Sequence, residues 1–311
     1  MKISDVQAIV TAPAGIRLVV VKVLTDTDGL YGLGCATFTQ RPLTVVTEIE
    51  QYLKPMLIGR DPADISDIHS ALYLSGYWRG GAVMNNALAG VDQALWDIKG
   101  KVANLPAYQL FGGKVRDELA TYVHVNGSSE TEIAQNIAKL AKSGFKNFRV
   151  QVALANNASY GIGKAEETKF GTQPSQSYRL SEQTARWDEV AYLTAVPKLF
   201  EYLRENLPAE YNYIHDVHER ISPNAAINLA KQLEQFNLFF LEDPVSPDDT
   251  GYLAQLRSQS AIPIAIGELF THPSEYLPLI QNRQLDYIRC HITQIGGITP
   301  AIKLTHFADV Y

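Results

Sequence analysis

Cysteine, long apolar runs and blocks of like charge are scarce in this chain of 311 residues. The two cysteines, Cys35 and Cys290, are far apart and lack metal-binding spacing, which excludes a disulfide framework and a cysteine-based metal site. No stretch approaches the roughly 20 apolar residues that a membrane-spanning helix needs. The first six residues contain no apolar signal-peptide region. We therefore expect a cytoplasmic protein without a membrane partner.

Positive charge is also in short supply. The chain has 27 Lys and Arg residues against 33 Asp and Glu residues, which gives a net charge of −6 at pH 7. This balance argues against a nucleic-acid partner. Hydrophobic residues make up 46% of the chain and charged residues 19%, an ordinary composition for a globular protein with a sizeable core.

The first part of the chain, residues 1–115, predicts an α+β domain. Alternating, β-rich segments indicate a three-stranded antiparallel meander, with strands at 3–11, 16–25 and 30–38. Helical periodicity follows at 42–57, 63–74 and 82–103. Strands followed by helices are typical of an α+β arrangement rather than of a parallel sheet.

Residues 116–311 instead alternate between strand and helix, which indicates parallel strands in a second domain. Strands are predicted at 119–125, 146–152, 212–217, 237–242, 262–267 and 285–291. Helices are predicted at 130–143, 186–206, 223–236, 250–258, 273–282 and 299–310. The pattern permits a doubly wound sheet or a (β/α) barrel.

Three acids decide between these two folds. Asp216, Glu242 and Glu268 each end a short apolar run, and successive acids are 26 residues apart. Acids at the exits of consecutive parallel strands converge on one rim, which in a (β/α) barrel holds the active site. Clustered carboxylates repel one another unless a cation neutralises them, and oxygen ligands favour Mg²⁺. The sequence therefore predicts a barrel with one Mg²⁺ ion, whereas a single strand-end acid would indicate only a loop.

The segment at 153–184 interrupts the alternation. It is polar, and it is longer than the connections that a compact domain normally contains. We interpret it as a mobile active-site loop, with plain disorder as the alternative.

Several motifs together resemble the enolase superfamily. They are the run Ala89-Gly-Val-Asp-Gln-Ala-Leu-Trp-Asp-Ile-Lys-Gly-Lys101, Leu-Glu-Asp-Pro at 241–244 and Gly-Glu at 267–268. Tyr77-Trp-Arg, His215-Asp-Val-His-Glu-Arg220 and Asp286-Tyr-Ile-Arg289 resemble its mannonate dehydratase branch, and the chain also resembles the D-galactonate dehydratase family and its starvation-sensing homologues. The resemblance extends over essentially the whole chain.

This resemblance implies an N-terminal capping domain on a modified barrel, with Mg²⁺ held by Asp216, Glu242 and Glu268. It also implies a homo-oligomer and a sugar-acid substrate, D-mannonate or a related aldonate such as D-gluconate, that loses water to give a 2-keto-3-deoxy acid. Removal of a proton beside a carboxylate builds an enediolate, whose charge a divalent cation stabilises. The family has eight barrel strands, whereas six are predicted before Tyr311. We expect the sequence to be incomplete there, with a truncated product as the alternative.

The catalytic residues implied by the resemblance are Tyr160, Arg149 and His218. The strand at 146–151 lacks the Lys-x-Lys pair of the racemase and muconate branches and has Arg149 at the matching place. Tyr160 in Ser-Tyr-Gly is the candidate base, and it needs a neighbouring cation such as Arg149 to ionise near neutral pH. An ion pair in the barrel is the alternative for Arg149, and a loop anchor for Tyr160.

His218 lies two residues beyond Asp216, a spacing that places both side chains on one face of a strand. It is a candidate general acid for the departing hydroxyl group, with orientation of a carboxylate as the alternative. His124 and Arg289 resemble positions that bind the sugar acid.

Two other hypotheses stay open, and the first is motivated by the polar segment at 153–184 and by Thr39, which replaces an Asn that contacts substrate in the family. One is a homologue with little or no dehydratase activity and a regulatory role. The other is a racemase or cycloisomerase, which the missing Lys-x-Lys pair disfavours.

Overall fold

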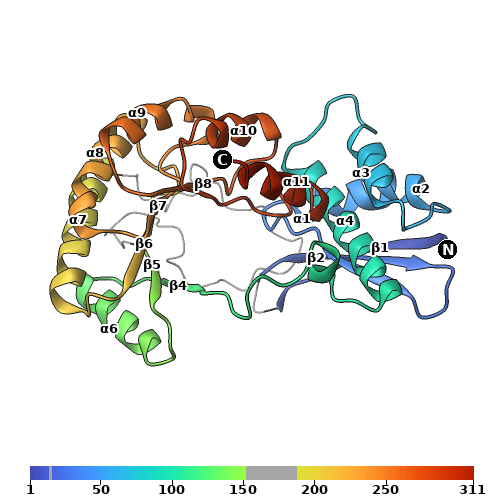
Figure 1. Ribbon diagram of the computed structural model, residues 1–311, viewed down its shortest axis with the longest axis horizontal. Helices are drawn as coiled ribbons and strands as arrows, with labels where there is room; N and C mark the ends of the chain where they lie inside the picture. The colour runs from blue at the N-terminus through green and yellow to red at the C-terminus, as the bar shows by residue number, and fades with distance from the viewer. Residues whose placement is uncertain (14–15, 152–187) are drawn as a thin grey trace, which may run out of the picture.

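The computed structural model describes residues 1–13, 16–151 and 188–311. Within these ranges, no helix is long and apolar enough to cross a membrane. The described residues form two sheets, a three-stranded sheet near the N-terminus and a six-stranded sheet that curves through the rest of the molecule (Figure 1).

The N-terminal sheet is the predicted antiparallel meander of β1 (Ile3–Thr11), β2 (Leu18–Thr25) and β3 (Tyr31–Cys35). Every second side chain of β2 is buried, because successive side chains of a strand point to opposite faces and one face lies against the core. Val19, Val21 and Val23 on that face are fully buried. The opposite face of β2, which is apolar except for Lys22, remains partly exposed.

Helices cover the buried face of this sheet. α1 (Pro42–Thr47), a π-helical segment η2 (Glu48–Leu53) and α2 (Lys54–Leu57) together fill the helix predicted at 42–57. α3 (Ile65–Tyr73) and the long α4 (Ala82–Ala103) follow, and the short α5 (Ala107–Leu110) was not predicted.

The close approach of α4 to the sheet depends on glycine. A Cβ atom on Gly34 of β3 would lie 2.0 Å from the carbonyl oxygen of Gly90, and one on Gly32 would lie 1.9 Å from that of Ala94. Both distances are far shorter than a carbon–oxygen contact allows, so the strand can lie against the helix only without side chains there.

The second sheet contains six parallel strands in chain order, which confirms the predicted barrel architecture. The strands are β4 (Tyr122–Val125), β5 (Asn147–Val150), β6 (Asn212–Asp216), β7 (Phe240–Glu242), β8 (Ile264–Ile266) and β9 (Tyr287–Ile288). Each is shorter than the apolar run that predicted it, because pairing ends where the neighbouring strand ends. β8 and β9, for example, share only two residue pairs, Ala265 with Tyr287 and Ile266 with Ile288.

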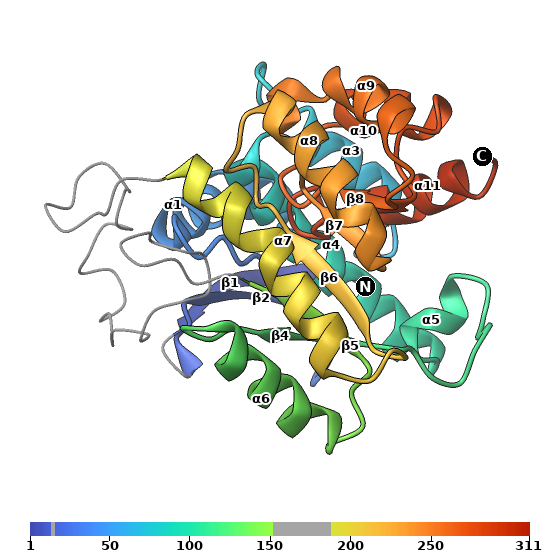
Figure 2. The ribbon, with the colours of Figure 1, turned by 90° about the vertical axis from the view of Figure 1, so that its left-hand side faces the viewer.

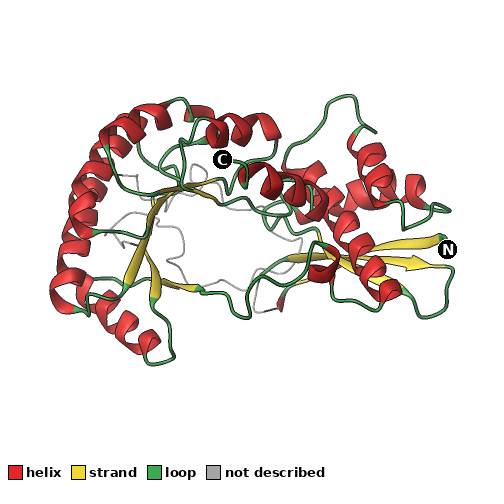
Figure 3. Ribbon diagram, viewed as in Figure 1, coloured by secondary structure: helices red, strands yellow, loops and turns green. Residues whose placement is uncertain are grey.

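Helices line the outside of this curved sheet, as Figure 3 shows by secondary structure. They are α6 (Glu130–Ala141), α7 (Glu189–Asn206), α8 (Pro223–Leu233), α9 (Tyr252–Gln259), α10 (Pro273–Gln281) and α11 (Ile298–Ala308). Short 3-10 turns, η3 (Glu234–Phe236) and η4 (Pro247–Asp249), follow α8 and β7. In the rotated view of Figure 2, α6, α7 and α8 lie across the outer face of the strands.

Each sheet has its own hydrophobic core. One cluster joins β1 and β2 with α1, α3 and α4, and the larger one joins the parallel strands with the helices from α6 to α11. Polar side chains of α3 and α4 connect the two units by hydrogen bonds to the segment 271–299. The predicted division into residues 1–115 and 116–311 stays a prediction.

Candidate active site

The carboxyl ends of β6 and β7 bring acidic side chains together. Asp216 and Glu242 are the last residues of these strands and pair across the sheet. Asp243 follows directly, and all three are almost completely buried. One carboxylate oxygen from each residue lies within 4.8 Å of the others, a grouping that could hold a metal ion. The parallel register therefore brings two of the three predicted strand-end acids, Asp216 and Glu242, to the same rim.

The third member of this group differs from the predicted one. Glu268 lies just beyond β8, and its carboxylate is 4.0 Å from the Arg289 guanidinium. Asp243, in a left-handed backbone conformation (φ 40°), takes the third place in the cluster. Its Oδ1 also accepts a 3.0 Å hydrogen bond from the Gly267 amide. Burial, reinforced by the charge of Asp216, raises the pKa of Asp243 to about 7. Glu268 as a metal ligand stays a prediction.

Arg149 is the central cation of the site. It extends from β5, is 2% exposed and forms an ion pair with Asp216 Oδ2. Its Nε lies 2.9 Å from Glu242 Oε2, and its Nη1 lies 3.0 Å from His124 Nε2. One guanidinium thus links two acids with a candidate substrate-binding residue. Burial, together with the charges of Arg149 and Arg289, lowers the pKa of His124 and favours its neutral form.

His218 lies beside Asp216, although not by the strand periodicity on which its prediction rested. β6 ends at Asp216, and His218 and Glu219 both have positive φ values, 56° and 58°. This turn brings His218 Nδ1 to 3.2 Å from Asp216 Oδ2. Burial acts to raise the pKa of Asp216, but the hydrogen bond from His218 and the charge of Arg149 outweigh burial and lower it.

Arg289 and His124 share an aromatic neighbour. The His124 ring stacks on Tyr122 at a centroid distance of 5.7 Å, and the Arg289 guanidinium lies 5.6 Å from the same ring. Arg289 also forms an ion pair with Glu242 and remains 30% exposed at its side chain. Both predicted substrate-binding residues therefore lie at the partly open side of the acid cluster.

The contact of Gln151 with Asp216 was not predicted. Gln151 donates a 3.1 Å hydrogen bond from Nε2 to Asp216 Oδ2. Its place two residues after Arg149 could have predicted this contact, because residues two apart on a strand point to the same side.

His215 is fully buried between Tyr192 and β5. Its Nδ1 lies 3.0 Å from the Val150 carbonyl oxygen and its Nε2 lies 2.7 Å from the Tyr192 hydroxyl. Burial lowers its pKa to about 4, so His215 is a neutral packing residue.

Tyr160 and the loop predicted at 153–184 lie outside the described residues. The structure therefore brings together Arg149, His218, Asp216 and Glu242, with Arg289 and His124 beside them. The assignment of Tyr160 as the catalytic base stays a prediction.

The donor set fits a hard divalent cation. The cluster offers only carboxylate oxygens, which Mg²⁺ prefers over nitrogen or sulfur. Asp216 Oδ1 is buried and has no hydrogen-bond partner among the described residues, so one ligand oxygen is available without breaking another bond.

Comparisons with known proteins agree with this geometry. Residues 2–112 match the family "Mandelate racemase / muconate lactonizing enzyme, N-terminal domain", and residues 132–311 match "Enolase C-terminal domain-like". A D-galactonate dehydratase family member of Salmonella virchow is 49% identical over all of this chain and 75% of its own length. One from Streptomyces is 41% identical over all of this chain and 69% of its own length.

Solved structures show the same fold. A crystal structure of an enolase from Pantoea ananatis with bound D-gluconate and Mg has a TM-score of 0.91 and 48% identity, and covers 99% of this chain and 75% of that one. A putative galactarate dehydratase from Agrobacterium radiobacter has a TM-score of 0.83 and 26% identity, and covers 100% of this chain and 72% of that one. The chain belongs to the enolase superfamily, among the relatives of the D-galactonate dehydratase family.

Proposed function

We propose that this protein is a Mg²⁺-dependent sugar-acid dehydratase that acts on D-mannonate or on a related aldonate such as D-gluconate. The observation that carries the proposal is the placement of Arg149 and His218 against Asp216 and Glu242 at one rim of the barrel. The Pantoea ananatis relative with bound D-gluconate and Mg supports both the substrate class and the metal.

Asp216, Glu242 and Glu268 would hold the metal ion. Bound there, Mg²⁺ supplies positive charge to the substrate carboxylate as negative charge develops on it. Asp243 is the alternative third ligand. Its existing bond to the Gly267 amide favours a positioning role for Asp243 and leaves Glu268 as the ligand.

The protein residues would divide the proton transfers between them. Tyr160, ionised with the help of Arg149, would remove the proton from C2 of the sugar acid. His218 would donate a proton to the C3 hydroxyl group, which leaves as water, and the product is the enol of a 2-keto-3-deoxy acid. Arg289 and His124 would orient the substrate, since a guanidinium suits a carboxylate or hydroxyl-rich ligand.

An assay of the full-length protein across C6 aldonates with Mg²⁺ tests this proposal. We expect a 2-keto-3-deoxy product from D-mannonate or D-gluconate, and a loss of at least about 100-fold in kcat for His218→Asn, as for removal of a general acid. Thr305→Val, on the exposed surface of α11, is the control and should retain full activity. Tight aldonate binding without turnover by the wild-type protein would instead favour a sugar-acid-binding regulatory protein.

The third ligand can be identified separately. Mg²⁺ titration of Glu268→Gln and Asp243→Asn should show a large loss of affinity only for Glu268→Gln, because Asn at 243 can still accept the Gly267 bond. The reverse result would assign Asp243 to the metal.

A further inference from the structure

We propose that Asn85, on the capping-domain helix α4, is a positioning residue that couples two loops of the active site. The first is the β8 loop (residues 267–272), which carries Glu268. The second is the β9 loop (residues 289–297), which begins with Arg289. This inference rests on the proposed function only in assigning these loops to a sugar-acid site.

One side-chain amide bridges the two loops. Asn85 Nδ2 donates a 2.7 Å hydrogen bond to the Thr271 carbonyl oxygen and a 2.6 Å hydrogen bond to the Gln294 carbonyl oxygen. Both amide hydrogens are therefore used, one on each loop. Asn85 is 1% exposed, so neither carbonyl could exchange this donor for water without moving.

The loops need an external support because their strands are very short. β8 contains three residues and β9 contains two, so backbone pairing fixes little beyond the strands themselves. Where the loops begin they lie against each other, since a Cβ atom on Gly267 would be 3.3 Å from the Arg289 carbonyl carbon. A shift of one loop would therefore disturb the other.

Other bonds from the capping domain reach only one of these loops or the residues just after it. Asn86 Nδ2 donates to Gln294 Oε1 at 2.8 Å, and His69 Nε2 lies 3.3 Å from the Gly296 carbonyl oxygen. Asp92 accepts the Thr299 amide at 2.9 Å. Among the hydrogen bonds of the described residues, the bridge between both loops is made by Asn85.

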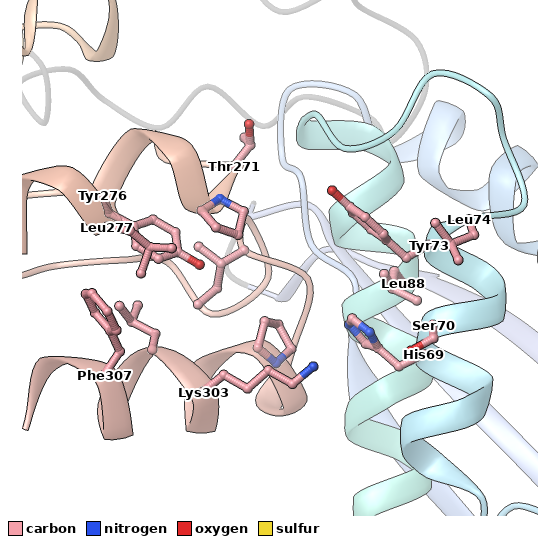
Figure 4. Close-up of a pocket in the computed structure, with 14 residues that line it drawn as sticks. His69, Ser70, Tyr73, Leu74, Leu88, Thr271, Tyr276, Leu277, Lys303 and Phe307 are labelled. Carbon is pink, nitrogen blue, oxygen red and sulfur yellow. The ribbon is translucent and has the colours of Figure 1, made fainter.

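Apolar packing next to the Asn85 bridge is incomplete, so the two hydrogen bonds make a larger share of the contact between the loops and the capping domain. A cavity of about 550 Å³ lies between side chains of α3 and α4 and side chains of α10 and α11, and Leu88, Thr271 and Ile295 are among its lining residues. Figure 4 shows Thr271 on the barrel side of this cavity and Leu88 on the opposite side. The two hydrogen bonds of Asn85 therefore lie beside a part of the boundary that side chains do not fill.

Hydrogen exchange of the metal-free full-length protein tests the coupling without using activity. Asn85→Leu keeps a side chain of similar shape but removes both donors. We expect the amide exchange rate to rise roughly tenfold in both the β8 loop and the β9 loop, since each loop loses a buried hydrogen bond. Asn85→Ser, which is too short to bridge, should give the same result if Asn85→Leu does not fold.

Val91→Ala is the matched control, because Val91 is buried in the capping-domain core and contributes no bond to either loop. It should destabilise α4 without raising exchange selectively in the two loops. In the Asn85 variants we further expect the Mg²⁺ dissociation constant and the KM for the sugar acid to rise several-fold, with a smaller change in kcat.

An increase confined to one loop, or an equal increase in Val91→Ala, would overturn the proposal. If both loops respond in Asn85→Leu while the wild-type protein neither binds Mg²⁺ nor dehydrates aldonates, the coupling is supported and the proposed function fails.

Discussion

Arg149 compensates more buried negative charge than any other cation in the described part of the chain. It contacts both Asp216 and Glu242, which are at most 2% exposed. Burial of two carboxylates side by side is unfavourable unless a positive charge lies between them. In the absence of a metal ion, Arg149 meets this requirement together with Arg289, which pairs with Glu242. The residue proposed to assist catalysis therefore also stabilises the metal-free fold.

Arg149→Met should lower the free energy of unfolding of the metal-free protein by about 3–5 kcal/mol, because it leaves buried carboxylates unpaired. Urea denaturation measures this loss. Arg60→Met is the control, since Arg60 pairs with Asp67 on the surface and should cost less than about 1 kcal/mol. Equal losses in the two variants would show that Arg149 has no special role in stabilising the acid cluster.

His69 makes the stability of the domain boundary depend on pH. Burial lowers the pKa of His69 from 6.5, while the charge of Asp92 opposes this shift and Lys303 adds to it. Since the unfolded chain takes up a proton on this residue at a higher pH than the folded chain, the contribution of His69 to stability falls as the pH drops below 6.5. Asp92 has the opposite dependence, because burial raises its pKa above 3.8.

His69→Gln should reduce this loss of stability at acidic pH. Glutamine can still donate to the Gly296 carbonyl oxygen but does not titrate. Between pH 7 and 5, we expect the unfolding free energy to fall more steeply in the wild-type protein than in His69→Gln. The slopes of the two proteins should differ by up to about 1.4 kcal/mol per pH unit. Urea denaturation at several pH values measures both slopes, and parallel curves would mean that His69 is not the titrating group.

At the scale of elements, the sequence predicted helices better than strand ends. The apolar periodicity of 82–103 matches the bounds of α4, because a long helix repeats the same signal over many turns. The apolar run at 285–291 gave only the two-residue β9, since an apolar run does not reveal where a neighbouring strand stops pairing. The residues of the candidate site lie at such strand ends. The alternation of side chains along a strand therefore could not predict the turn that brings His218 to Asp216.

The contact between α4 and the N-terminal sheet should be intolerant of any side chain at position 34. Gly34→Ala places a Cβ atom 2.0 Å from the Gly90 carbonyl oxygen, a backbone group that cannot move alone. We expect a loss of about 3 kcal/mol in unfolding free energy, at the upper end for overpacking.

Gly251→Ala is the control for this substitution in urea denaturation. It meets nothing within 4 Å at a negative φ of −56°, and should change stability by less than about 0.5 kcal/mol. A Gly34→Ala protein as stable as this control would show that α4 does not lie so close to β3.

At the scale of the whole molecule, the acids could be predicted but their surroundings could not. Equal spacing along the chain placed Asp216 and Glu242 at one rim, since consecutive parallel strands end at the same edge. The contact of Asp243 with the Gly267 amide, and that of Asn85 with Thr271, join residues 24 and 186 positions apart. Such distances leave no local pattern in a single sequence.

The polar boundary also predicts how metal binding affects the capping domain. Mg²⁺ at about 100 times its dissociation constant should stabilise the folded protein by about 2.7 kcal/mol, because it binds only the folded state. If Asn85 and Asp92 link the two cores, this stabilisation should slow hydrogen exchange in α4 as well as in β6 and β7. Glu242→Gln, which removes one of the proposed ligands, should abolish both effects. Slower exchange confined to the parallel strands would instead mean that the two cores open independently. Metal binding at the site would then leave the stability of α4 unchanged.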